Sequence, residues 1–342
     1  MRIFLHVGQP KSGTTAIQRA LAQHSDTDPA PVLYYPKAGR LERKLVGHHN
    51  LAYELYDPAK YRAELGSWAD MAAEVRALEP DRAGVITISS EALRPFLAKV
   101  VAAKLRKLLP DVPAQVGMYL RPQWEYVESG YVQLRRFAQT DLDLRGFWET
   151  TGRRIADYRA TVEAWQAAMG AERVICLPFD AAVRRTGVVR DFLDKGLCIE
   201  TDYDNRAQVN ERMGLVAMSA VRHVRDAVRA RLDRPVAIPG RTVMKLSQIF
   251  RDHPDERLSY SFMPPGLQDE IHAAALPSNR WLAERWPGFD SPAFLDRPAP
   301  DTRPFVAELP ELGAAERARC QPIVDELVRR LAGTDETAKT TA

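Results

Sequence analysis

Short apolar runs alternate with helical segments through the first 200 residues of the chain. The runs at 3–8, 84–90, 115–121 and 173–179, with a shorter one at 32–36, are apolar at nearly every position. Runs of this kind are typical of strands that are buried on both faces. Segments with a helical period, such as 97–109 and 188–196, lie between or after them. This alternation predicts an α/β fold with a central parallel sheet covered by helices.

From about residue 200 the pattern becomes helical and irregular. Residues 210–232 and 264–276 predict amphipathic helices, and the proline-rich stretch 287–310 predicts an extended surface arm. We therefore expect an α/β core over 1–200, a mostly helical part of the same domain over 201–332 that packs on this core, and a disordered tail over 333–342.

Composition narrows the class of protein. The 342 residues include 27% charged and 45% hydrophobic residues, with a net charge of +3, which describes an ordinary globular chain rather than a nucleic-acid-binding one. Three widely spaced cysteines predict neither a disulfide framework nor a zinc site. No apolar stretch approaches about 18 residues, and no signal peptide opens the chain. We expect a cytoplasmic protein without stable membrane insertion, and the Ala- and Arg-rich composition is typical of a high-GC bacterium.

The most informative motif lies between the first strand and the first predicted helix. In "HVGQPKSGTTAIQ", residues 6–18, Gly8 and Gly13 have the G-x-x-x-x-G spacing of a phosphate-binding loop. In such a loop, backbone N–H groups and a helix N-terminus face an anion. A nucleoside triphosphatase would continue with lysine after the second glycine, whereas here Thr14 and Thr15 follow it and Lys11 precedes it.

The sequence also lacks a convincing magnesium ligand at the end of a strand. Asp180 follows the run 173–179, but Pro178 interrupts that run, and an aspartate after a strand is more often a turn former. No metal site is therefore expected.

The loop "QPKSGTTAIQ" resembles the 5′-phosphosulfate loop of sulfotransferases, whose donor is 3′-phosphoadenosine 5′-phosphosulfate (PAPS). The resemblance implies a P-loop-like three-layer α/β/α fold and assigns Lys11 to the bridging oxygen of the donor. It implies that the residues of the loop bind the cofactor: Pro10, Lys11, Ser12, Gly13, Thr14 and Thr15. A sulfuryl group carries less charge than a γ-phosphoryl group, so positioned donors and one lysine can take the place of magnesium.

A second motif matches the site that the family uses for the 3′-phosphate of this donor. In "YLRPQWEYVESGYVQL", Arg121 closes a strand, Pro122 occupies a helix start, and Ser129 follows Arg121 by eight residues. Eight helical residues span about 12 Å, most of which an extended arginine and a phosphate can bridge. The resemblance therefore implies that Arg121 and Ser129 bind the 3′-phosphate.

The similarity continues with lower specificity over 155–180. Tyr158 and Trp165 have the spacing of a helix that lies near the adenine in the family, so Tyr158 is a candidate cofactor-binding residue. The match covers about 1–60 and 80–200. Its general character is that of the bacterial branch, which is also similar to carbohydrate-modifying enzymes; the cytosolic phenol and steroid enzymes have tryptophan where Ala16 stands here.

Two places compete for the general base that takes the proton of the acceptor. Glu91 ends the run 84–90, at the edge where open α/β sheets bind ligands, although it could instead cap a helix beginning near Ala92. His48 and His49 follow the second strand, although they could be loop residues before Asn50 as a helix N-cap. Glu91 is preferred narrowly over His49, and His6 is expected to be a packed strand residue.

The sequence thus predicts a PAPS-dependent sulfotransferase that acts on a hydroxyl or amine of a carbohydrate or small metabolite. A P-loop kinase and a non-catalytic nucleotide-binding module of the same fold are the alternatives. The acceptor is not specified: Trp124, Tyr126, Tyr131 and the pair Arg135–Arg136 could border its cleft or simply belong to a packed helix. No nucleic-acid partner is expected, and the oligomeric state is left open.

Overall fold

The computed structural model describes residues 1–27, 32–41, 46–78, 84–200 and 213–339, with side chains as far as residue 332. The chain divides into two compact units. The first consists of Met1–Tyr126, Arg154–Gln208 and His272–Pro298, and the second of Val127–Arg153, Val209–Ile271 and Ala299–Ala342.

A parallel sheet forms the centre of the first unit. Within the described residues it has five strands in the order β2-β3-β1-β4-β5. Their bounds are β1 (Arg2–His6), β2 (Leu33–Tyr34), β3 (Val85–Ser89), β4 (Ala114–Leu120) and β5 (Val174–Pro178). Every strand coincides with an apolar run of the sequence, which confirms the predicted α/β fold with a central parallel sheet.

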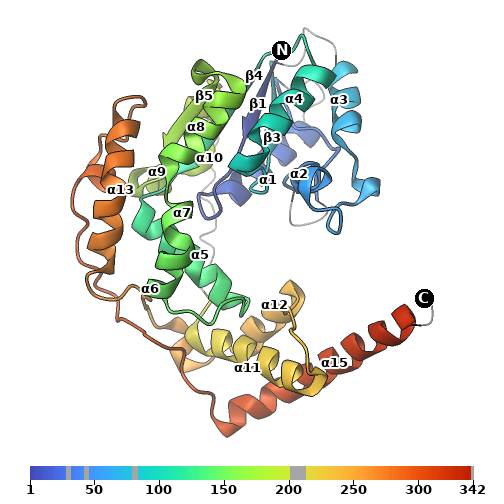
Figure 1. Cartoon of the computed structure of the whole chain (residues 1–342), viewed down its shortest axis with the longest axis vertical. Coiled ribbons are helices and arrows are strands. Elements are labelled where there is room, and N and C mark those ends of the chain that lie inside the picture. The colour runs from blue at the N-terminus through green and yellow to red at the C-terminus, as the bar shows by residue number, and fades with distance from the viewer. Residues whose placement is uncertain (28–31, 42–45, 79–83, 201–212, 340–342) are drawn as a thin grey trace. The chain divides into compact units, whose positions relative to one another are not determined.

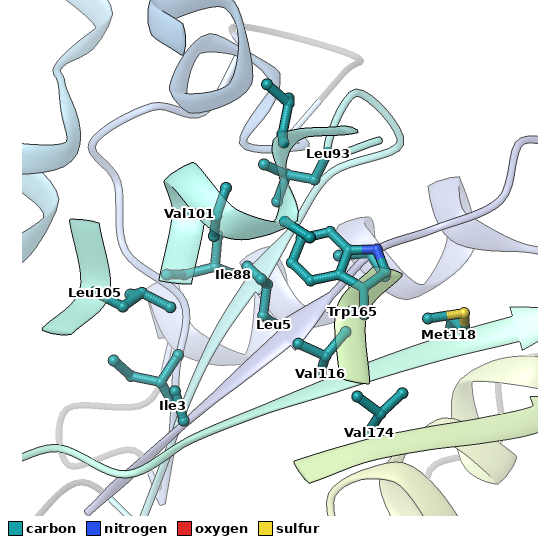
Figure 2. Packing of buried hydrophobic residues seen from close by; sticks show 14 of the residues in the cluster. Ile3, Leu5, Ile88, Leu93, Val101, Leu105, Val116, Met118, Trp165 and Val174 are labelled. Atoms are coloured by element: carbon teal, nitrogen blue, oxygen red, sulfur yellow. The ribbon is translucent and has the colours of Figure 1, made fainter. Parts of the chain in front are cut away.

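Alternate residues of the strands enter two separate cores, one on each face of the sheet. Ile3 and Leu5 of β1 pack into one core, and Phe4 packs into the other. In the first core, side chains of β1, β3, β4 and β5 lie around Trp165, which is fully buried (Figure 2). A sheet with an apolar core on both faces is the middle layer of a three-layer α/β/α arrangement.

Helices of the first unit supply the outer layers. α3, α4 and α8 pack into the core of Ile3, whereas α1 and α10 pack into the core of Phe4. Figure 1 shows α4 and α8 beside the strands that they cover. The bounds are α1 (Thr14–Thr27), α2 (His49–Tyr56), α3 (Trp68–Arg76), α4 (Ala98–Leu108), α8 (Tyr158–Met169), α9 (Ala181–Thr186), α10 (Val188–Asp191) and α14 (Pro292–Leu295).

The second unit is helical. Its core includes buried side chains of α11 (Leu215–Leu232), α12 (Gly240–Ile249) and α15 (Ala314–Lys339), and it also contains the short α6 (Leu144–Phe147). A boundary between the two units falls within each of three helices: α5 (Gln123–Arg136), α7 (Arg153–Ile155) and α13 (Leu267–Ala283).

The proline-rich stretch 287–310 differs from the expected surface arm. Phe289 and Phe294 are fully buried and belong to the core of the first unit, and Pro292–Leu295 forms α14. Phe294 also positions Asn279, because its carbonyl accepts a hydrogen bond from the Asn279 side chain. The proline content marked an irregular backbone correctly, but two aromatic side chains anchor that backbone in the core.

Several other bounds differ from the sequence-based ones. The compact units do not divide at residue 200, since 272–298 belongs to the first unit and 127–153 to the second. α11 begins at Leu215, and residues 210–212 of the helix expected there lie outside the described residues. α15 continues to Lys339, through most of the tail expected to be disordered, and 340–342 are not described. Packing of the helical part on the core stays a prediction.

Candidate functional site

Three chain segments that carry candidate residues follow adjacent strands of the sheet. The loop with Lys11 follows β1, Glu91 follows β3, and Arg121 follows β4, and β1 lies between β3 and β4. Because the strands are parallel, all three segments leave the sheet at its carboxyl edge. In open α/β sheets this edge is where ligands bind.

The loop after β1 has the backbone conformation of an anion cradle. Lys11 and Gly13 both have positive φ angles, of 70° and 75°, and left-handed residues in a turn point successive N–H groups toward one side. The N–H groups of Ser12, Gly13, Thr14 and Thr15 make no hydrogen bond to a described residue. The last two belong to the first turn of α1, where the helix itself offers no acceptor.

Close packing fixes the glycines of this loop. A Cβ atom on Gly13 would lie 2.7 Å from Cγ1 of Val188, and one on Gly8 would lie 2.7 Å from Cγ2 of Thr14. Gly13 therefore lets the loop contact α10, and Gly8 lets the end of β1 approach the start of α1. Both contacts hold the loop in one shape.

Two buried polar side chains of the loop have no partner among the described residues. The Ser12 hydroxyl and the amide oxygen of Gln9 are buried and make no hydrogen bond. A buried polar group without a partner is costly, unless a ligand supplies the missing hydrogen bond. Ser12 can donate to an anionic oxygen, which fits a bound phosphate or sulfate group. Pro10 and Thr15 are partly exposed beside them.

Glu91 lies against this loop rather than at a helix start. The Thr14 hydroxyl, which donates to the Gln9 carbonyl at 3.2 Å, lies close enough to the Glu91 carboxyl group to affect its pKa. The residues after Glu91 form a turn, and the next helical segment begins only at Pro95. The role of a helix cap is therefore wrong for Glu91. Burial raises its pKa above the ordinary value, while the Thr14 hydroxyl and the positive charge of Lys11 partly lower it. A buried carboxyl group with a raised pKa is a stronger base than an exposed one, which suits proton transfer.

His49 is the first residue of α2, and its ring contacts Ser90, the residue before Glu91. Nδ1 lies 2.7 Å from the Ser90 hydroxyl oxygen, which also accepts a hydrogen bond from the N–H of Ala92. The ring can accept the Ser90 hydrogen at Nδ1 or donate its own hydrogen to the Ser90 oxygen, so His49 stays the alternative to Glu91 as the base. Burial lowers the pKa of His49 to about 4.

Both ring nitrogens of His48 are used in hydrogen bonds to the backbone. Its Nδ1 accepts from the N–H of Ser89 at 3.2 Å, and its Nε2 donates to the carbonyl of Pro36 at 2.8 Å. It occupies the N-cap position of α2, whereas Asn50 lies inside the helix and bonds to the backbone of Arg62, so an Asn50 N-cap is wrong.

His6 is a packed strand residue, as expected. It is 1% exposed, its Nδ1 lies 2.8 Å from the Ser89 hydroxyl, and burial lowers its pKa to about 3. Burial also lowers the pKa of His48 to about 3. Neither ring is a base for a ligand.

Arg121 reaches the loop and is held by a carboxylate. Its Nη1 donates to the Lys11 carbonyl at 3.3 Å, and its guanidinium pairs with Glu125 at 2.7 Å. Arg184 of α9 pairs with the same Glu125 at 2.8 Å. Two guanidinium groups around one carboxylate leave a net positive charge at this end of β4.

Tyr158 holds the backbone of Arg121 through a hydrogen bond. Its hydroxyl donates to the Arg121 carbonyl at 2.6 Å, and the residue is fully buried. Its direct contact with a cofactor stays a prediction. Ser129 lies further along α5, in the part that belongs to the second unit, so its pairing with Arg121 also stays a prediction.

Glu125 and Arg184 were missed by sequence reasoning. Glu125 stands four residues after Arg121 on α5, a spacing at which helical ion pairs form, so the signal was present. Arg184 follows a different strand, and only the three-dimensional arrangement of β4 and β5 brings it to Glu125. Asp180 caps α9 by accepting from the N–H groups of Ala182 and Val183, as expected of a turn former.

Metal ligands and membrane-spanning helices are not found in the described ranges. Side chains of His, Cys, Asp and Glu do not gather there in groups of three or more that could hold a metal ion. None of the helices in the same ranges combines the length and apolar character needed to span a membrane.

Comparison with known proteins shows a similarity to a solved sulfotransferase structure. No protein-family model matches the chain, and no curated protein matches it. A crystal structure of a sulfotransferase from Alicyclobacillus acidocaldarius is 23% identical, covers 69% of this chain and 97% of its own, and superposes with a TM-score of 0.37. At that score the assignment of the fold rests on the sheet and its two cores.

Proposed function

We propose that this protein is a PAPS-dependent sulfotransferase that transfers a sulfuryl group to a hydroxyl or amine of a carbohydrate or small metabolite. The observation that carries the proposal is the loop after β1, where the buried Ser12 hydroxyl and a set of N–H groups have no partner among the described residues. Glu91, which can act as a base, lies close to Thr14 of the same loop.

The donor would be held by two groups of residues. The backbone N–H groups from Ser12 to Thr15 and the Ser12 hydroxyl suit the 5′-phosphate, which a helix N-terminus also favours. The 3′-phosphate is assigned to Arg121 and Ser129. Support for Arg121 comes from Arg184, because the second guanidinium on Glu125 leaves positive charge available to an anion.

In the proposed reaction the acceptor oxygen or nitrogen forms a bond to sulfur while the bond from sulfur to the bridging oxygen breaks. The acceptor proton moves to the Glu91 carboxylate, and the electron pair of the broken bond stays on the 5′-phosphate of the leaving adenosine 3′,5′-bisphosphate. Lys11 would stabilise the negative charge that develops on this oxygen. His49 is the alternative base, and no metal is required.

Binding measurements with the intact protein test this proposal without knowledge of the acceptor. Calorimetry in the presence of EDTA should show adenosine 3′,5′-bisphosphate binding at least about 10-fold more tightly than AMP or ATP, the lower range for hydrogen bonds to a charged group. Equal affinities for AMP and the bisphosphate would remove the 3′-phosphate site and the proposal with it. Magnesium-dependent preference for ATP would identify a kinase instead.

The matched variants are Arg121→Ala and Arg185→Ala. Arg185 is an exposed residue of α9 that follows Arg184. Its side chain makes no hydrogen bond or ion pair with a described residue. Arg121→Ala should weaken bisphosphate binding by about 1.5–3 kcal/mol and leave AMP binding nearly unchanged, whereas Arg185→Ala should change neither.

A further inference from the structure

Two adjacent arginines at the end of α5, in the second unit, have no anionic partner among the described residues. Arg135 is 7% exposed, and the Nε atoms of both Arg135 and Arg136 are buried without a hydrogen bond. Neither guanidinium forms an ion pair or a hydrogen bond with a described residue. Buried cations in proteins are normally paired, because removing the charge from water is costly.

Capping of the helix does not explain these arginines. Arginines near a helix C-terminus often bond to its last carbonyl groups. In α5, backbone N–H groups of the following residues bond to carbonyl groups of the last turn instead. The N–H of Gln139 bonds to the Leu134 carbonyl, and the N–H of Ala138, which has a φ of 49°, bonds to the Arg135 carbonyl. The Ala138 carbonyl accepts from Arg225. The guanidinium groups of Arg135 and Arg136 are therefore not used as caps.

Nearby acidic side chains are engaged elsewhere. Asp141 pairs with Arg225 at 2.7 Å, and Asp143 caps α6 by accepting from the N–H of Gly146 at 2.7 Å. Glu128, also on α5, pairs with Arg303 at 2.8 Å. These three carboxylates thus satisfy other groups.

Aromatic rings are the contacts that remain. The guanidinium carbon of Arg135 lies 5.9 Å from the ring centre of Tyr131, and that of Arg136 lies 6.0 Å from the ring centre of Phe137. These distances are at the outer limit of a cation–π interaction, and they satisfy none of the N–H donors. Phe137 also adjoins the N-terminus of α12, since a Cβ atom on Gly240 would lie 3.8 Å from its ring. A helix N-terminus adds attraction for negative charge.

We propose that Arg135 and Arg136 form an oxyanion-binding site of the second unit, for the carboxylate or sulfate group of a small-molecule ligand. The planar guanidinium group offers paired donors that match two oxygens of either anion. Such a ligand would supply the hydrogen bonds that the buried Nε atoms lack. This proposal does not depend on sulfuryl transfer by the first unit.

Nuclear magnetic resonance of the full chain labelled with ¹⁵N-arginine tests the site directly. The Nε–H signals of the two arginines are assigned from Arg135→Met and Arg136→Met. Titration with sodium sulfate, and separately with sodium glucuronate, is compared with sodium chloride at the same ionic strength. We expect a saturable shift of the Arg135 signal with sulfate or glucuronate that is absent with chloride. The anion that saturates this shift at the lower concentration identifies the anion class.

Thermal unfolding gives the second readout. Saturating adenosine 3′,5′-bisphosphate is present throughout to occupy the loop after β1, and the anion that shifts the Arg135 signal should still raise the unfolding temperature. Arg135→Met should reduce the apparent anion affinity about 10-fold or more, and Arg229→Met, at an exposed position of α11, should not. If Arg135→Met folds poorly, Arg135→Lys keeps the charge but loses the paired donors and should show a smaller loss.

Two outcomes would overturn the proposal. An Arg135 signal that does not respond to either anion, or that responds equally to chloride, means that the arginines only pack against the rings. An anion effect that survives Arg135→Met belongs to another place in the chain. Failure of the bisphosphate to bind would instead count against the sulfotransferase function, because the Arg135 signal reports the second unit alone.

Discussion

At the scale of single residues, the two candidate bases differ in their surroundings. His49 contacts the Ser90 hydroxyl through Nδ1 at 2.7 Å, and burial lowers its pKa to about 4. Glu91 has a carboxyl group beside Thr14 and Lys11 whose pKa is raised by burial. The sequence predicted Glu91 only narrowly ahead of His49, because the contact between Ser90, the residue after β3, and His49 of α2 joins segments that are far apart in the sequence.

The variant Glu91→Gln separates catalysis from stability. With the base removed, turnover should fall about 100- to 10,000-fold, measured with radiolabelled donor and an acceptor found by screening. Bisphosphate affinity should stay within about 3-fold of the native value, because glutamine keeps the shape and leaves the loop intact. Near-normal turnover in Glu91→Gln, together with an inactive His49→Asn, would make the histidine the base.

The same variant has a second expected effect, on folding. The folded-state pKa of Glu91 is raised, so the stability from its protonated form is present below its ordinary pKa and is lost as pH rises through the folded value. Glutamine resembles the protonated form at every pH. Urea unfolding should therefore find Glu91→Gln more stable than the native protein at pH 7, with the difference disappearing near pH 3.

In the proposed reaction Lys11 stabilises the leaving group and also lies close enough to Glu91 to affect its carboxyl group, so its removal should change two measurements. Lys11→Ala should reduce turnover by about 100-fold, the effect of losing one electrostatic donor. Its positive charge also lowers the pKa of Glu91, so the variant should move the titration of the Glu91 carboxyl, followed by ¹³C resonance, to higher pH. An unchanged titration would mean that Lys11 and Glu91 do not share one site.

At the scale of elements, the loop after β1 depends on its contact with α10. Gly13 has a φ of 75°, and an added Cβ would lie 2.7 Å from Val188. Gly13→Ala should destabilise the protein by about 2–4 kcal/mol, the combined cost of a left-handed alanine and an overpacked contact. It should also abolish bisphosphate binding, because the loop must move.

Gly266 provides the matched control for this substitution. Its φ of 81° is similar, but an added Cβ would meet nothing within 4 Å. Gly266→Ala should therefore cost only the conformational strain, about 1–2 kcal/mol, and leave bisphosphate binding unchanged. Equal costs in urea unfolding for the two variants would show that the contact of Gly13 with Val188 does not constrain the loop.

Elements defined by local pattern were predictable from the sequence, whereas contacts between distant segments were not. The continuous apolar runs located β1, β3, β4 and β5, and the glycine spacing located the loop, because both signals are contained in a few neighbouring residues. Arg184 reaches Glu125 across about sixty residues of sequence, and no periodicity reports such a pair. The burial of Phe289 and Phe294 was concealed by the prolines around them.

At the scale of the whole molecule, His6, His48 and His49 make the stability of the first unit sensitive to acid. Burial lowers the pKa of His6 and His48 to about 3 and that of His49 to about 4. Between these values and the ordinary histidine pKa, the unfolded chain binds more protons than the folded one. Stability should therefore fall as pH decreases from about 6.5, by up to about 1.4 kcal/mol per pH unit for each histidine.

Fluorescence of the variant Trp148→Phe can follow this loss in the first unit. Trp148 belongs to the second unit, and the other five tryptophans lie in the first. Urea unfolding of this variant between pH 7 and pH 4.5 should show the decrease in stability, and His6→Asn should make the decrease shallower. Replacement of the exposed His24 by glutamine should leave the slope unchanged. A stability that does not depend on pH in this range would contradict the burial of the histidines.

The interleaved composition of the first unit has a consequence for synthesis on the ribosome. Its last strand ends at Pro178, but Phe289 and Phe294, which complete one of its cores, emerge much later, after most of α11 to α13. Until then the nascent chain holds a finished sheet with an uncovered apolar surface. Such surfaces are bound by chaperones or associate with one another. The speed at which translation passes through residues 179–294 thus decides how long each new molecule must be protected.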